Sequence, residues 1–86
     1  MEIGPTKLFH IIIRVPKQDS AFFYFLLEAH EGLAFYSTLP HEIGQAFRDI
    51  DMKGSLELLS ALEQLIDGFC KVSPESKIIQ QREIID

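Results

Sequence analysis

Apolar and polar residues alternate most regularly near the start of the chain, over residues 8–15. A period of two is typical of a β-strand, so we predict a strand at Leu8–Val15 that ends at Pro16. Its two sides differ in character, and the wholly apolar side should face the core. That side carries Phe9, Ile11, Ile13 and Val15, and the other side carries His10, Ile12 and Arg14.

The next apolar residues follow helical spacing, which predicts a helix over residues 20–31. Asp19 or Ser20 can cap its start, and Gly32 suits the left-handed position that ends a helix. Two neighbouring stripes of this helix are apolar, which is more than one sheet can cover. The first stripe is Phe22, Phe25, Leu26 and Ala29, and the second is Phe23 and Leu27, joined by His30 and flanked by Tyr24.

We expect the apolar surplus of this helix at a contact between two chains. The predicted interface residues are Phe23, Tyr24 and Leu27 of the second stripe, or Ile12 on the uncovered face of the sheet. Such surplus apolar surface on a small domain usually marks a subunit interface.

Further strands are predicted at Leu33–Leu39 and Gln45–Met52, and Lys53-Gly54-Ser55 reads as a turn and cap. A second helix should run from Leu56 to about Asp67 and stop at Gly68. Its predicted inward residues are Leu58, Leu59, Leu62, Leu65, Ile66 and Phe69.

The end of the chain, including the tail of residues 73–86, is compatible with either strand or helix. Phe69–Val72 could form a short fourth strand, and Ser73-Pro74-Glu75 is typical of a helix start. We favour a terminal helix over Lys77–Ile85, although Ile78, Gln80, Arg82 and Ile84 also alternate as in a strand.

The predicted order is β-α-β-β-α, closing with a further strand, in one domain over 1–86 whose core covers about 7–72. This order indicates an α+β, ferredoxin-like (ACT-like) fold, a split β-α-β arrangement with an antiparallel sheet and two helices on one face. The crossover rule places the first and third strands side by side, and we expect them to be parallel.

The composition of the chain argues against several classes of function. The net charge of −5 and the eight scattered basic residues argue against nucleic acid and against anionic membranes. The longest apolar runs, Ile11–Ile13 and Ala21–Leu27, fall far short of the roughly 20 residues that span a bilayer. The start lacks the basic region of a signal peptide, and the single cysteine excludes an internal disulfide, so a cytoplasmic location is expected.

The amino-acid sequence of the first half of the chain resembles that of a known family. The residues that carry it are Arg14-Val15, Asp19, Phe22, Phe25-Leu26-Leu27-Glu28-Ala29, Glu31-Gly32-Leu33-Ala34 and Ser37-Thr38-Leu39. They resemble an uncharacterised bacterial family, domain of unknown function 4911. The resemblance covers residues 8–52 in the residues themselves and residues 55–67 only in the pattern of apolar positions. The resemblance implies a small ACT-like, ferredoxin-fold domain and no established activity.

One departure from the broader ACT class concerns ligand binding. ACT ligand sites commonly use a glycine between the first strand and the first helix, where backbone approaches the ligand closely. This chain has Pro16-Lys17-Gln18-Asp19-Ser20 at that connection. An amino-acid ligand is therefore not implied by the resemblance alone.

Candidate catalytic and metal-ligating residues are sparse. None of His10, His30 and His41 has a second ligand at a spacing typical of metals, so neither a metal nor a cofactor is predicted. Asp19 is best explained as a helix cap, and the other acids as solvated ends. Cys70 has no base at a recognisable spacing and is expected to be a small buried residue, so an enzyme is not favoured.

His10 and Arg14 form the polar pair of most interest, because on a strand they share one face about 13 Å apart. They could line an anion-binding or subunit-contact platform, or Arg14 could simply pair with Asp49 or Asp51 on the next strand. We predict a non-catalytic regulatory or interaction module that forms a homodimer or binds another protein. The alternative is a small-molecule sensor with a ligand at the dimer interface near His10, Arg14 and Asp19.

Overall fold

The computed structural model describes residues 7–85, which form four strands and two α-helices. Each helix is preceded by one 3-10 turn, η1 before α1 and η2 before α2. In chain order the elements are β1 (Lys7–Pro16), η1 (Lys17–Asp19), α1 (Ser20–Ala29), β2 (Phe35–Thr38), β3 (Phe47–Ser55), η2 (Leu56–Leu58), α2 (Leu59–Val72) and β4 (Lys77–Ile85).

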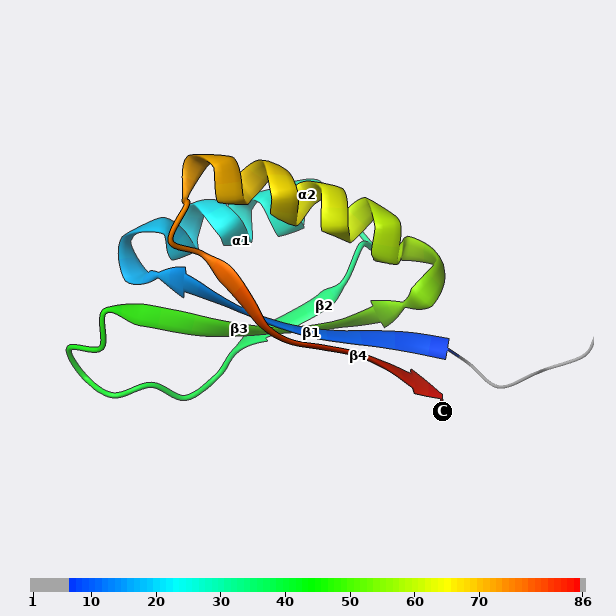
Figure 1. The fold of residues 1–86 in the computed structure, drawn as a ribbon, viewed down its shortest axis with the longest axis horizontal. Helices are drawn as coiled ribbons and strands as arrows, with labels where there is room; N and C mark the ends of the chain where they lie inside the picture. Colours follow the sequence, from blue (N-terminus) through cyan, green and yellow to red (C-terminus); the bar gives the residue numbers. More distant parts are fainter. Residues whose placement is uncertain (1–6, 86) are drawn as a thin grey trace, which may run out of the picture.

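The four strands form one sheet in the order β2-β3-β1-β4, and both helices cover the same face of it (Figure 1). The ferredoxin-like prediction is confirmed, including the adjacency of the first and third strands. Their predicted parallel direction is wrong, because every neighbouring pair is antiparallel. The helical crossover makes β1 parallel to β2, and β3 then returns from β2 between them, so β3 must run against both.

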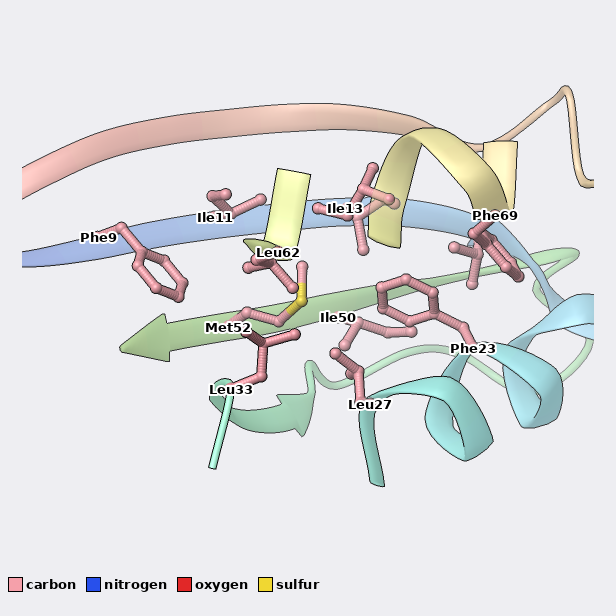
Figure 2. Close-up of a cluster of buried hydrophobic side chains, with 12 residues drawn as sticks. Phe9, Ile11, Ile13, Phe23, Leu27, Leu33, Ile50, Met52, Leu62 and Phe69 are labelled. Carbon is pink, nitrogen blue, oxygen red and sulfur yellow. The ribbon is translucent and has the colours of Figure 1, made fainter. Parts of the chain in front are cut away.

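The core lies between the sheet and the helices. Phe9, Ile11, Ile13 and Val15 of β1 are all fully buried, as the alternating pattern predicts. Figure 2 shows Phe9, Ile11 and Ile13 of β1 among core residues from β3 and both helices. The remaining core members are Phe23, Leu27, Leu33, Ile50, Met52, Leu62, Ile66 and Phe69.

The two apolar stripes of α1 are exchanged relative to the prediction. Phe23 is fully buried and Leu27 nearly so, whereas Phe22 is 44% and Phe25 is 64% exposed. The Phe23 ring packs on Phe69 with centroids 4.8 Å apart. An interface through Phe23 and Leu27 is therefore wrong, because both side chains are already used by the core of the chain. Tyr24 is only half-buried, as is Ile12 on the opposite face.

The end of the chain corrects two predictions. Helix α2 continues through Gly68 to Val72, so this glycine is not a stop, and Leu58 lies in the preceding turn and is exposed. The favoured terminal helix over Lys77–Ile85 is wrong, since this segment is β4 and pairs with β1. Pairing with a central strand satisfies backbone groups that the local sequence could equally have satisfied in a helix.

Strand β3 extends past its predicted end and includes Gly54, where a turn was expected. A Cβ at this position would lie 2.8 Å from the Phe9 ring and 3.1 Å from the Leu33 carbonyl oxygen. Glycine is needed here because the buried aromatic ring lies directly against the β3 backbone.

Candidate functional site

The face of the sheet away from the helices carries most of the polar side chains that the sequence singled out. His10, Ile12 and Arg14 of β1 lie there, opposite Lys53, Asp51 and Asp49 of β3. On the other side of β1, β4 places Arg82 opposite His10 and Gln80 opposite Ile12. Two separate polar clusters result, one around each of the two predicted residues.

Arg14 is held in a fixed orientation by two contacts on β3. Its Nε donates to Asp49 Oδ1 at 2.8 Å and its Nη2 donates to Asp49 Oδ2 at 3.0 Å. The guanidinium also lies 4.0 Å over the centre of the Phe47 ring. The hydrogen bond to Asp49 raises the pKa of Arg14 above its ordinary value. The predicted pairing of Arg14 with an acid on the next strand is confirmed.

His10 lies buried in the second cluster, and its partners define its tautomer. Arg82 Nε is 3.1 Å from His10 Nδ1, and arginine can only donate, so Nδ1 accepts. The ring proton must then be on Nε2, which donates to Asp51. Both ring nitrogens are engaged, and neither is available to remove a proton from a substrate.

Asp19 does not cap α1, which corrects the sequence prediction. No side-chain cap bond forms there, and Asp19 Oδ2 instead accepts a hydrogen bond from Ser73 Oγ at 2.6 Å. The hydroxyl of Ser76 lies 2.8 Å from that of Ser73, and both serines are buried. Since Ser73 gives its proton to Asp19, Ser76 donates to Ser73. These contacts tie the turn after α2 to the turn before α1.

A hollow of about 350 Å³ opens beside Arg14, at the end of the uncovered face. It brings Arg14 together with the β1–α1 connection that the sequence placed near a ligand. His10 and Asp19 do not line it, so the three predicted ligand-binding residues do not form one site. The lining residues are Arg14, Pro16, Gln18, Ala46, Phe47, Glu75 and Lys77.

Lys77 is the cationic lining residue that sequence reasoning missed. It is the first residue of β4 and lies directly opposite Arg14 in the strand register. Predicting a helix at this position removed any reason to place it beside Arg14. The alternation of the tail was the signal that could have revealed it.

The other residues considered for catalysis or metal binding are less well placed for those roles. Burial raises the pKa of the Cys70 thiol, with a smaller contribution from Asp67, which disfavours the nucleophilic thiolate. His30 Nδ1 lies 2.9 Å from the Leu26 carbonyl oxygen near the end of α1. Within residues 7–85, no group of three His, Cys, Asp or Glu side chains is placed to hold a metal ion. Neither helix of that range has the length and apolar character to cross a bilayer.

Comparison with known proteins identifies a family and a fold. A family model described as Domain of unknown function (DUF4911) matches residues 13–66, and the chain belongs to this family. No curated protein matches the chain. Among solved structures, De novo designed protein Foldit4 is similar with a TM-score of 0.60 and 14% identity, over 93% of this chain and 97% of that one. At this identity the likeness shows the fold alone.

Proposed function

We propose that this member of the DUF4911 family is a non-catalytic interaction domain that forms a homodimer by pairing the β4 strands of two copies. The observation that carries the proposal is the outer edge of β4, a nine-residue strand at the end of the sheet. An edge strand presents a row of backbone donors and acceptors that another strand can satisfy. The opposite edge, β2, has only four residues and offers a shorter template.

The sequence of β4 leaves this edge open to pairing. It contains no proline or glycine, and its register shift against β1 is confined to the segment near Ile78 and Ile79. Both of these isoleucines are partly exposed. Residues 80–85 run in regular register with β1, so their outer backbone groups can meet a second regular strand.

The uncovered face of the sheet is less suited to a dimer contact than the β4 edge. On the uncovered face, the charges of Arg14, Asp49 and Asp51 already have partners, and covering them with apolar surface would add a desolvation penalty. The engaged ring nitrogens of His10 and the raised pKa of Cys70 favour a non-catalytic role.

A second copy of this chain is the partner that fits, because two identical antiparallel edges satisfy each other around a two-fold axis. Centring the axis on Gln81 places Gln80 opposite the partner's Arg82, with both side chains on the same face. Moving the centre to Arg82 would put two arginines directly opposite each other, which is unfavourable. We therefore expect the register centred on Gln81.

Sedimentation of the wild-type protein at micromolar concentration should give the mass of a dimer. The register is tested by Gln81→Cys in a Cys70→Ser background, followed by mild oxidation. Residues opposite each other in antiparallel strands have Cα atoms about 4.5–5.5 Å apart, within the range that a disulfide bridges. A covalent dimer should therefore form in high yield.

Glu83→Cys in the same background is the matched control, since it lies two residues away on the same strand and face. In the expected register the two copies of residue 83 are four residues out of alignment, or about 13 Å apart. This variant should stay monomeric on a non-reducing gel. A monomeric wild-type mass, or equal cross-linking of the two variants, would overturn the proposal.

A further inference from the structure

We infer that the hollow beside Arg14 is a binding site for a small organic anion that carries a carboxylate or a phosphate group. This goes beyond the proposed dimer, because every residue of the hollow comes from one chain. Three observations carry the inference: the fixed orientation of Arg14, the position of Lys77 and the nature of the remaining walls.

The guanidinium of Arg14 is arranged before any ligand arrives. Asp49 engages one edge of it through Nε and Nη2, and Phe47 supports its plane at 4.0 Å. A guanidinium has five N–H donors, so three remain, two on Nη1 and one on Nη2. A donor group fixed in place loses little entropy on binding and can hold an oxyanion with defined geometry.

Lys77 places a second cation directly across from Arg14 on the same face. Like charges directly opposite each other in a sheet are destabilising. Within residues 7–85, no carboxylate oxygen lies within 4.0 Å of the Lys77 ammonium, whereas Lys53 has such a neighbour in Asp51. Asp49 already pairs with Arg14, so an anion between Lys77 and the remaining N–H groups of Arg14 would give Lys77 the partner that it lacks.

The other walls indicate the size and chemistry of the ligand. Pro16, Ala46 and Phe47 are apolar, and Gln18 adds an amide that can donate or accept. The volume of about 350 Å³ lies at the lower end of the range for small-molecule sites. Glu75 is the single carboxylate in the lining, and Asp49 is paired with Arg14, so Lys77 is the lining cation that has no carboxylate oxygen within 4.0 Å among residues 7–85. A compact anion with a short apolar portion fits these walls.

The test is an amide-resolved NMR titration at low ionic strength with inorganic phosphate and, separately, with acetate. Saturable shifts should be concentrated at Gln18, Ala46 and Lys77. Lys77→Met should weaken the binding of the preferred anion by about fivefold or more, as expected for removing one charge near the ligand. Glu75→Gln should tighten it, since it removes the repelling carboxylate.

Lys53→Met is the matched control, because it removes the same charge from the same face outside the hollow. The affinity of Lys53→Met for the anion should equal that of the wild type. The mass of Lys77→Met in sedimentation should also equal that of the wild type, so that a loss of anion binding is distinguished from a loss of the dimer. Equal losses in the Lys77→Met and Lys53→Met variants, or shifts that never saturate with either anion, would overturn the inference.

Discussion

Tyr36 illustrates how one contact sets the chemistry of a side chain in this protein. Its hydroxyl donates to Glu28 Oε1 at 2.5 Å, joining β2 to α1. This hydrogen bond is the main cause that raises the pKa of Tyr36 above 10.0, with burial and nearby charges adding to it. Only the neutral phenol can donate the bond, so the carboxylate favours the protonated form.

Removing that carboxylate should lower the pKa of Tyr36 toward its ordinary value. The chain has two tyrosines, so a Tyr24→Phe background isolates the signal of Tyr36. In this background Tyr36 should ionise above pH 10.0, and adding Glu28→Gln should bring the midpoint down, as followed by the absorbance of tyrosinate. Glu31→Gln removes a charge just beyond the same helix and should leave the midpoint in place. Identical midpoints with and without Glu28 would show that the contact does not control the ionisation.

Individual residues could be predicted where strand register decides their neighbours. The prediction that Arg14 pairs with Asp49 or Asp51 follows from two adjacent strands with alternating faces, and the structure shows Asp49 as the partner. The bond from Ser73 to Asp19 joins residues 54 positions apart and depends on how two turns meet. No local pattern contains that information, so Asp19 was assigned to the nearest helix end instead.

At the scale of elements, α1 shows what periodicity can and cannot decide. Its apolar positions predicted a helix correctly, starting at Ser20, but two adjacent stripes fit the helical period equally well. In the structure the stripe containing Phe23 lies on the core side, where the Phe23 ring packs on Phe69. The stripe containing Phe22 and Phe25 is left toward solvent. Which stripe faces inward depends on the direction in which the crossover approaches the sheet.

Alanine substitutions distinguish the two stripes of α1. Phe23→Ala should destabilise the protein by about 3–5 kcal/mol, because it removes a fully buried ring from a packed core. Phe25→Ala makes the same chemical change at a 64% exposed position and should change the free energy of unfolding by less than about 1 kcal/mol. Urea denaturation monitored by circular dichroism measures both. A larger loss at Phe25 than at Phe23 would restore the stripe assignment made from the sequence.

The tail was the element predicted least well. Alternation over residues 78–84 was visible, yet the Ser73-Pro74-Glu75 start favoured a helix. Pairing with β1 decides the outcome, because a central strand with an unpaired side provides partners for a full row of backbone groups. The strand then places Lys77 opposite Arg14 and brings Arg82 to His10, so one wrong element concealed a neighbour of each predicted residue.

At the scale of the whole molecule, the order of elements predicted the ferredoxin-like arrangement, with two helices on one face. The direction of β3 relative to β1 was missed, although the short β2–β3 connection already required it. The similar designed protein agrees with the fold, and the matching family is described as one of unknown function. The proposals therefore rest on one sheet edge and one hollow, and both depend on β4.

Ending the chain after Ser76 should abolish cooperative folding. Without β4, strand β1 loses one of its two neighbours, and the row of fully buried side chains from Phe9 to Val15 lies on a strand with an open edge. A small domain has little stability to spare, so thermal denaturation should show no sharp transition. Glu83→Gln in the full chain is the control, because it keeps the strand and changes one exposed side chain, and it should keep the wild-type transition. A truncated chain that melts like the full one would mean that β4 is an addition to the fold, and both the dimer edge and the position of Lys77 would then lose their structural basis.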